Sequence, residues 1–259
     1  MDHPANAFKR AIQSGKAVYG TWLVSGAPST AEALGCAGFD FLVLDTEHTP
    51  IETPQVAEIL RTIAGTPASA IVRPAWNDMV LIKRVLDAGA QSLLVPFVQS
   101  AEEARRAVSY TRYPPDGVRG VAAVHRGSRF GTVANYLRGA AAEICVIVQV
   151  ETLPALDALP EIAAVPGVDS IFVGPGDLAA SLGHLGDIAN PAVQTKLELA
   201  AQACRKLGKP CGIVGPNPQM VAKFVEYGYT WVAVNSDLGM MVSRAQEWLE
   251  QLKRTSGKT

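Results

Sequence analysis

The chain has 259 residues, of which 48% are hydrophobic and 18% are charged, and its formal net charge is −1. This composition is typical of a globular protein with a substantial core, and without a basic face we expect no nucleic-acid partner. The N-terminus lacks an apolar run of signal-peptide length, and no stretch approaches the ~18 apolar residues that span a bilayer, so we expect a cytoplasmic protein without membrane contact.

The four cysteines form no CxxC pair, and three of them lie in apolar stretches. We expect Cys36, Cys145, Cys204 and Cys211 to be buried free thiols in a reducing cytoplasm, without a catalytic role. A disulfide framework is therefore not expected.

Short apolar runs rich in β-branched residues alternate with longer stretches of helical period along the whole chain. Most of these runs are continuously apolar, as expected for parallel strands covered on both faces. The eight predicted strands are residues 17–24, 39–45, 69–74, 91–96, 144–151, 168–174, 211–215 and 230–235. This pattern predicts a single α/β domain over residues 1–259, a (β/α)8 TIM barrel, with an open doubly wound sheet as the structural alternative.

Capping residues and glycines mark the predicted helix ends. Ser29, Asn77 and Ser100 are the expected N-caps, and Glu103 stands at capping-box spacing from Ser100. The predicted C-terminal stops are Gly38, Gly65, Gly89, Gly208 and Gly228.

One long irregular segment, residues 112–131, separates the fourth predicted main helix from the fifth strand. Long loops are uncommon in compact domains and are often functional. The sequence leaves two roles open for this loop, a lid over the active site or a contact between subunits.

Ionisable and polar residues gather where the predicted strands end, which is the catalytic end of a (β/α)8 barrel. A protein with a purely structural role has no need of so many charges on one rim. They are Asp45, Thr46, Glu47 and His48 after the second strand, Arg73 after the third, Gln149 and Glu151 after the fifth, Asp177 after the sixth, and Asn235, Ser236 and Asp237 after the eighth.

Glu151 and Asp177 follow neighbouring predicted strands, whose backbones lie ~5 Å apart. Two carboxylates at that separation repel each other unless a cation or a shared proton neutralises them. A hard divalent cation fits, Mg²⁺ or Mn²⁺ with Co²⁺ tolerated, and two protein ligands leave coordination positions for water and substrate. From spacing alone the alternative is equally open: each carboxylate caps the helix that follows its strand.

Two further features of this rim suggest acid–base and anion chemistry. Asp45 stands three residues before His48, where it can orient the imidazole and support its charge near neutral pH. Arg73 suits an anionic substrate or a developing oxyanion, with an ion pair to Asp45 or Glu47 as the alternative. Of the remaining histidines, His3 is expected to lie in a mobile terminus, and His125 and His184, in loops, are expected to be structural.

The turn Gly174-Pro175-Gly176 lets the main chain approach a ligand closely, so its N–H groups are expected to bind a substrate carboxylate where the next helix begins. Taken alone, this turn is a weak signal. Its value comes from its place on the same rim as the charged residues.

Five sequence motifs stand in order along the chain: DTEH at 45–48, VRP at 72–74, RYPPDGVRG at 112–120, VQVET at 148–152 and VDSIFVGPGDLAASLG at 168–183. Together they resemble the HpcH/HpaI family of class II pyruvate aldolases over roughly residues 18–252. The resemblance implies an aldehyde-lyase that reversibly cleaves a 4-hydroxy-2-oxoacid into pyruvate and an aldehyde through a metal-stabilised enolate.

The resemblance also implies a role for each matching residue. Glu151 and Asp177 would hold the metal, Gln149 would lie beside it, and the backbone of Gly174, Pro175 and Gly176 would hold the pyruvate carboxylate. Arg73 would stabilise the enolate oxygen. His48, supported by Asp45, would move protons through water, and Trp22 would wall the pocket, with ordinary core packing as its alternative.

The resemblance further implies a homohexamer, a dimer of trimers that exchange C-terminal helices. The apolar C-terminal helix expected at about 237–253 fits such an exchange, and equally fits docking on its own barrel. The segment VNSDL at 234–238, with His125 and Arg126, departs from the family pattern and puts the aldehyde partner in doubt. The residues NSDL at 235–238 resemble family members that act on substrates of the 2-dehydro-3-deoxyglucarate type. Substrates of the 4-hydroxy-2-oxoheptanedioate type are the alternative.

Three rival functions remain. A Schiff-base aldolase needs a lysine buried at a strand end, but the nine lysines lie in helices, at strand starts or near the termini. A lyase acting on CoA esters or phosphoenolpyruvate needs a phosphate cradle, which strands seven and eight do not offer. A catalytically inactive binding subunit is disfavoured by the complete set of rim residues.

Overall fold

The structure, a computed structural model, describes residues 1–255. Its centre is a closed barrel of eight parallel strands in which each strand pairs with the next along the chain and the eighth pairs with the first. The strands are β1 (Val18–Leu23), β2 (Phe41–Asp45), β3 (Ser69–Arg73), β4 (Ser92–Val95), β5 (Cys145–Val150), β6 (Ser170–Val173), β7 (Cys211–Gly215) and β8 (Trp231–Ser236). The predicted TIM barrel is confirmed, and the open sheet is excluded because β8 closes on β1.

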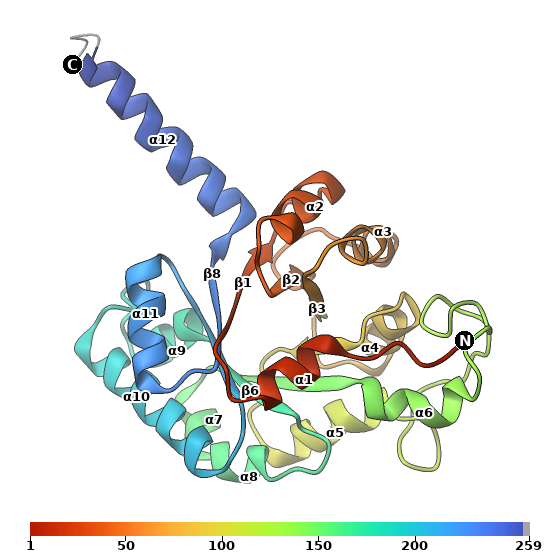
Figure 1. Cartoon of the computed structure of the whole chain (residues 1–259). Coiled ribbons are helices and arrows are strands. Elements are labelled where there is room, and N and C mark those ends of the chain that lie inside the picture. Colours follow the sequence, from red (N-terminus) through yellow and green to blue (C-terminus); the bar gives the residue numbers. More distant parts are fainter. Residues whose placement is uncertain (256–259) are drawn as a thin grey trace.

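Helices surround the barrel and connect successive strands (Figure 1). They are α1 (Ala7–Gln13), α2 (Pro28–Cys36), α3 (Thr53–Ile63), α4 (Met79–Asp87), α5 (Ala101–Thr111), α6 (Tyr136–Glu143), α7 (Leu153–Asp157), α8 (Leu159–Ala163), α9 (Pro175–Ser181), α10 (Pro191–Lys206), α11 (Pro218–Tyr227) and α12 (Asp237–Thr255). Within residues 1–255, no helix is both long enough and apolar enough to cross a membrane.

Aromatic side chains fill the interior of the barrel toward its N-terminal end. Phe8 of α1 packs edge-on against Phe41 and Trp231, with ring centroids 5.4 and 5.5 Å apart. Trp231 in turn lies 5.2 Å from Phe172. Gly212 makes room for this layer, since a Cβ there would lie 2.0 Å from the Trp231 ring. Because this end is filled, only the C-terminal end of the barrel remains open to a substrate.

The predicted helix caps are confirmed in part. The Ser100 side chain accepts from Glu103 N, as expected, although the Glu103 carboxylate turns to Gln99 N. The prediction for Ser29 is wrong, because the N-cap of α2 is Ala27, two residues earlier, and the helix begins at Pro28, whose fixed φ suits the first helical turn.

The expected cap at Asn77 is also wrong. Its neighbour Asp78 is the N-cap of α4 and accepts from the main-chain N–H groups of Val80 and Leu81. The Asn77 amide instead donates to the Glu103 carbonyl. Both side chains are good cap formers, so the sequence did not distinguish between these neighbours.

The long loop, residues 112–131, lies at the N-terminal end of the barrel, because it follows helix α5 and leads toward the start of β5. Arg119 pairs with Asp87 at the end of α4 at 2.7 Å, and Arg126 donates to the carbonyl of Ala88. A lid over the active site of its own chain is therefore wrong. A contact between subunits stays a prediction.

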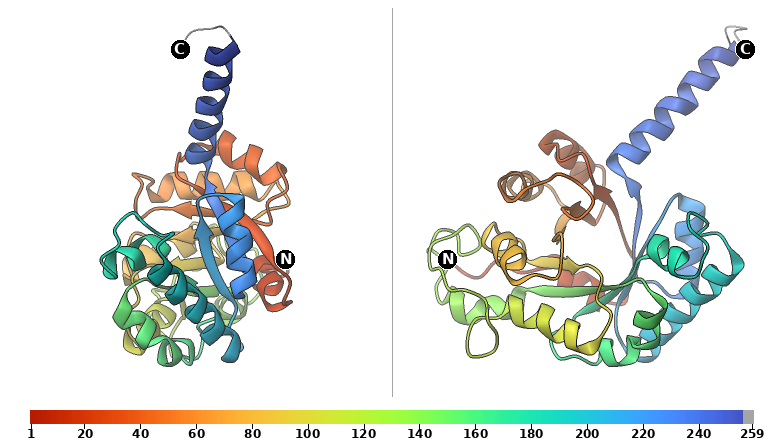
Figure 2. Two further views of the ribbon diagram at one scale, coloured as in Figure 1. Left: turned by 90° about the vertical axis from the view of Figure 1, so that its left-hand side faces the viewer. Right: turned by 180° about the vertical axis from the view of Figure 1, so that it is seen from behind.

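Helix α12 projects away from the barrel (Figures 1 and 2). Every residue from 241 to 255 is exposed, including Trp248 at 60% and Leu252 at 66%. The helix therefore does not dock on its own barrel, which was one of the two expectations from the sequence.

Candidate active site

The residues expected at the site converge on one cavity of about 290 Å³ at the C-terminal end of the barrel. Its lining residues are Trp22, Val24, Asp45, His48, Arg73, Gln149, Phe172, Gly174, Pro175, Gly176, Asp177, Val214, Asn235 and Ser236. Glu151 is buried beside this cavity, where its side chain contacts that of Gln149. The volume is enough for a small 2-oxoacid and a short aldehyde.

Arg73 is the most constrained charge of the site. Asp45 and Arg73 are register partners on β2 and β3, so their side chains lie next to each other. Arg73 Nε and Nη2 donate to the two Asp45 carboxylate oxygens at 2.9 and 2.8 Å. Glu47 Oε2 lies 3.0 Å from Nη1, and the guanidinium carbon lies 4.3 Å from the centroid of the Trp22 ring. The guanidinium is therefore fixed in position before any substrate binds.

The expected pairing of Asp45 with the His48 imidazole is not formed. Both Asp45 oxygens accept from Arg73, and Oδ1 also accepts from the main-chain N–H groups of Glu47 and His48. The His48 ring lies 3.9 Å from Glu47 Oε2, and its side chain is 66% exposed. Asp45 therefore positions Arg73 directly, while the imidazole stands at the mouth of the cavity.

Glu47 is a site residue that was considered from the sequence only as an ion-pair partner. Its side chain is 15% exposed and contacts both Arg73 and His48. Burial raises the pKa of Glu47, while the charges of Arg73 and His48 oppose that rise. Its place between two ionisable partners in the DTEH segment was the available signal.

The buried position of Glu151 makes its ionised form unfavourable, and a bound cation would offset that cost. Its Oε1 accepts from Phe97 N at 2.9 Å, and its Oε2 accepts from the Gln149 amide. Burial raises the pKa of Glu151 to about 7, with further contributions from the negative charges of Asp177 and Glu47. The metal-free site therefore disfavours the ionised carboxylate that a metal requires.

Asp177 stands in the first turn of α9, and its carboxylate makes no hydrogen bond or ion pair with any residue between 1 and 255. The N-cap of α9 is Gly174, and no side chain caps this helix. The alternative that Asp177 serves as a helix cap therefore finds no support. Its free carboxylate lines the same cavity that Glu151 borders.

The side chains of Glu151 and Asp177 fit a hard divalent cation in donor type. Both supply oxygen ligands, and the charges of Asp177 and Glu47 raise the pKa of Glu151, as expected for anionic groups gathered at one place. Within residues 1–255, no group of three or more acidic, histidine or cysteine side chains has the geometry of a closed metal site. A cation held here would keep positions open for substrate oxygens.

Two buried polar atoms of the cavity lack partners among residues 1–255, namely Gln149 Oε1 and Trp22 Nε1. In helix α9 the first intrahelical bond runs from Leu178 N to Gly174 O, so the N–H groups of Gly176 and Asp177 precede the helical ladder. Buried unpaired groups are rare in folded proteins. The unpaired polar groups of this cavity therefore indicate that it binds a polar ligand, which would form hydrogen bonds with them.

Of the three polar residues at the end of β8, only two line the cavity. Asp237 is buried, and its carboxylate accepts from the main-chain N–H groups of Val24 and Ser25. These two hydrogen bonds join the segment after β1 to the start of α12. Asn235 and Ser236 line the cavity. Asp237 is therefore structural, and its two neighbours form the polar edge of the mouth.

Comparison with known proteins agrees with this geometry. The family model described as HpcH/HpaI aldolase/citrate lyase matches residues 18–244. The chain is 52% identical to the 2-dehydro-3,6-dideoxy-6-sulfogluconate aldolase of Pseudomonas putida over 234 residues, 90% of this chain and 92% of the relative. It is 43% identical to the hydroxypyruvate/pyruvate aldolase of Sagittula stellata, covering 96% and 100% of the two chains.

A solved structure is also similar over nearly the whole length. The crystal structure of an HpcH/HpaI aldolase/citrate lyase family protein from Burkholderia cenocepacia J2315 matches with a TM-score of 0.93 at 40% identity, covering 96% of this chain and all of that one. The chain belongs to the HpcH/HpaI aldolase/citrate lyase family. Within that family it is a class II pyruvate aldolase, an aldehyde-lyase.

Proposed function

We propose that this aldolase reversibly cleaves 4-hydroxy-2-oxoacids into pyruvate and an aldehyde, with a divalent cation held by Glu151 and Asp177. The observation that carries the proposal is the meeting of these two carboxylates with the fixed Arg73 guanidinium at one small cavity. Mg²⁺ or Mn²⁺ is the proposed metal, with Co²⁺ tolerated, and it would act as a Lewis acid that stabilises negative charge on a chelating 2-oxoacid.

Arg73 would stabilise the oxygen on which negative charge develops when the C3–C4 bond breaks. Because Asp45 and Glu47 already hold the guanidinium, little reorganisation accompanies this step. Asp45 acts here as a positioning residue, through Arg73.

His48 would move the proton of the substrate C4 hydroxyl. In cleavage its imidazole, acting through water, takes that proton while the C3–C4 bond breaks, and in condensation it returns a proton to the aldehyde oxygen. The exposed place of the ring at the cavity mouth supports this role, because the aldehyde leaves by that route.

The remaining cavity residues would hold and orient the pyruvate moiety. Gln149 would orient the ligand through its unpaired Oε1 and hold Glu151 through its amide. The backbone of Gly174, Pro175 and Gly176 at the start of α9 would receive the pyruvate carboxylate. Trp22 would form the apolar wall and supply its buried N–H.

The aldehyde partner would carry a terminal anionic group. The Pseudomonas putida relative is named for a substrate with a sulfo group at the far end of its chain. The glucarate and heptanedioate types expected from the sequence likewise end in a second carboxylate. Asn235 and Ser236 give this side of the cavity a polar edge.

We further propose that the active protein is a homohexamer, a dimer of trimers in which α12 is exchanged between subunits. Support comes from the exposed apolar side chains of that helix, among them Met241, Trp248 and Leu252. Apolar surface of this extent is usually covered by a partner.

The test is pyruvate release from a panel of 4-hydroxy-2-oxoacids with anionic and neutral tails, with chelator and metal add-back. We expect activity that the chelator abolishes and Mn²⁺ or Mg²⁺ restores, with anionic tails preferred. Activity that survives the chelator and is lost on borohydride trapping with pyruvate would instead indicate a Schiff base. No described lysine lines the cavity, which is why we do not favour that reaction.

A further inference from the structure

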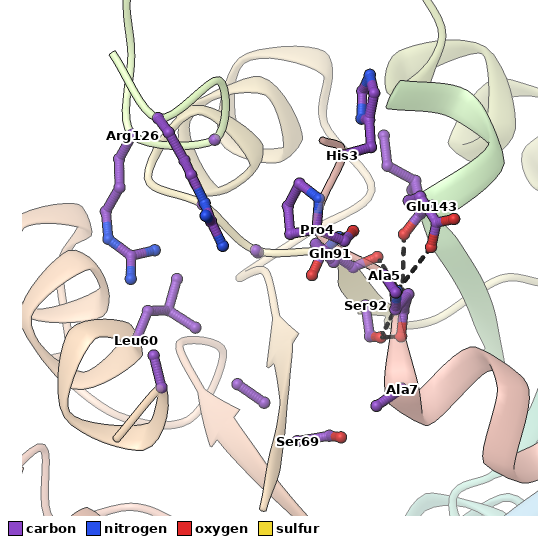
Figure 3. Close-up of a pocket in the computed structure, with 18 of the residues that line it drawn as sticks. His3, Pro4, Ala5, Ala7, Leu60, Ser69, Gln91, Ser92, Arg126 and Glu143 are labelled. Carbon is purple, nitrogen blue, oxygen red and sulfur yellow. Dashed lines mark hydrogen bonds between the residues drawn. The ribbon is translucent and has the colours of Figure 1, made fainter. Parts of the chain in front are cut away.

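A second and larger cavity, of about 510 Å³, lies at the opposite end of the barrel from the catalytic one. Its walls are the segment before α1, the end of α3, the starts of β3 and β4, and the loop around Arg126. Figure 3 shows Arg126 and Leu60 on one side and His3, Gln91 and Glu143 on the other. The aromatic layer inside the barrel separates it from the catalytic cavity.

Positive charge dominates the lining of this cavity. Arg61, Arg126 and Arg129 all border it, and none of them pairs with a carboxylate among residues 1–255. Glu143, the single acidic residue of the lining, is already engaged by Arg10 at 2.8 Å and by Asn6 N at 2.6 Å. The cavity therefore presents three guanidinium groups whose charge nothing in its lining neutralises.

Arg126 is held in place although its charge is unpaired. Its Nη1 donates to the carbonyl of Ala88, which follows the last turn of α4, at 3.0 Å. Gly89 leaves room for this contact, since a Cβ there would lie 2.1 Å from Nη1. Partial burial lowers the pKa of Arg126, and the nearby charges of Arg61 and Arg129 lower it further, so a bound anion would favour the charged guanidinium.

An apolar wall beside these charges suits a small organic body. Leu60, Ile63 and Ala68 are buried apolar residues of the lining. The Ser69 hydroxyl, at the start of β3, has no hydrogen-bond partner among the residues that the structure describes and lies in the same cavity (Figure 3). A ligand with one strongly charged end and a short, partly apolar remainder matches this arrangement.

We propose that this cavity is a second ligand site, separate from the catalytic one, which binds the dianionic group of a small phosphate monoester. Guanidinium groups bind tetrahedral dianions through paired N–H donors, and three of them favour a charge of −2 over that of a monocarboxylate. The bound ligand would join the N-terminal segment, α3 and the loop 112–131, and so stabilise the end of the barrel that contains no catalytic residue.

The test is isothermal titration of the full-length protein, with Mg²⁺ present, by inorganic phosphate and by phenyl phosphate. We expect one site per chain, with phenyl phosphate bound more tightly because of the apolar wall. Arg126→Gln removes the guanidinium that is hydrogen-bonded to the Ala88 carbonyl. Arg61→Gln removes an exposed guanidinium, and because this side chain is on the surface the variant should fold normally. Each should weaken binding by about tenfold or more.

Two control variants locate the ligand. Arg205→Gln changes an arginine of α10 that borders neither cavity, and Arg73→Gln changes the catalytic cavity alone. Both should bind phenyl phosphate as the unchanged protein does. Absence of binding at millimolar ligand, or binding lost in Arg73→Gln and retained in Arg61→Gln and Arg126→Gln, would overturn the proposal. The aldolase reaction plays no part in this measurement, so either proposal can fail without the other.

Discussion

Arg73 is fixed by two carboxylates and an aromatic face, and this arrangement depends on the geometry of a guanidinium. Lysine cannot make the paired contact with Asp45. We predict that Arg73→Lys lowers kcat for pyruvate release by about 10²–10³-fold, and lowers exchange of the pyruvate methyl protons as well. Arg205→Lys, on the surface of α10, is the matched control. Near-normal exchange in Arg73→Lys would contradict a role in stabilising the enolate.

His48 has a different task, since its imidazole stands at the mouth and not at the base of the cavity. We predict that His48→Ala lowers aldol cleavage by about 10²–10⁴-fold, the usual contribution of a general base. Exchange of the pyruvate methyl protons should be partly spared, because that step does not involve the C4 hydroxyl. His184→Ala serves as the control, and equal losses in both reactions would assign His48 to enolate formation.

The raised pKa of Glu151 predicts how metal affinity depends on pH. In the metal-free protein this carboxyl titrates at about 7, above its ordinary value, so it favours the folded state at low pH and loses that contribution as the pH rises through 7. Metal binding must displace the proton, so Mn²⁺ affinity should fall about tenfold per pH unit below 7. Titrations with Mn²⁺ at pH 6 and 8 measure this, and equal affinities would contradict it.

At the scale of elements, the turn from β6 into α9 sets the position of Glu151. A Cβ on Gly174 would lie 2.4 Å from Glu151 Oε2, whereas a Cβ on Gly176 would meet nothing within 4 Å. We predict that Gly174→Ala displaces this carboxylate and weakens Mn²⁺ binding by about tenfold or more, while the fold persists. Gly176→Ala should bind Mn²⁺ normally. Equal affinities in the two variants, measured by titration, would mean that this turn does not position the ligand.

The elements of the barrel were readable from the sequence because buried parallel strands are continuously apolar. All eight were predicted, and each predicted end lies within two residues of the observed one, as where 39–45 stands for Phe41–Asp45. The cap of α4 was displaced by one residue, since Asn77 and Asp78 are equally good caps in isolation. Local pattern therefore located the elements better than it located their ends.

The residues of the site were predictable as a set, and an ion pair of Arg73 with Asp45 or Glu47 was one of the alternatives, but the sequence did not decide between the possible partners of Asp45. Spacing along the chain put Asp45 next to His48, whereas the register between β2 and β3 puts it next to Arg73. Register depends on how two strands align, which no short segment encodes. For the same reason the sequence did not decide which of Asp45 and Glu47 pairs with Arg73, and the structure shows that both do.

The whole molecule has two unlike ends. Aromatic packing around Phe8 and Trp231 fills the N-terminal half of the barrel interior, so the catalytic cavity opens only at the other end. Helix α12 leaves the barrel directly after the buried Asp237 and extends into solvent (Figure 2). The exposed apolar side chains of this helix, among them Trp248 and Leu252, support the exchange between subunits that we propose.

The proposed exchange of α12 predicts a hexamer whose assembly depends on this helix. Trp248→Glu places a charge on its apolar surface and should shift the protein from hexamer to smaller species in light scattering. Gln246→Glu, which adds the same charge two residues away, should leave the mass unchanged. A monomeric unchanged protein would refute the proposed assembly without touching the chemistry of the site.

The central claim is that Glu151 and Asp177 hold one divalent cation for the 2-oxoacid. A crystal structure of the protein with Mn²⁺ and pyruvate tests it most directly, because the anomalous signal of manganese locates the ion independently of the protein atoms. We predict one manganese site with an oxygen of each carboxylate at about 2.0–2.3 Å, pyruvate on its open positions, and Arg73 against the keto oxygen. Manganese found elsewhere, with pyruvate in the cavity and neither carboxylate touching a metal, would contradict the account.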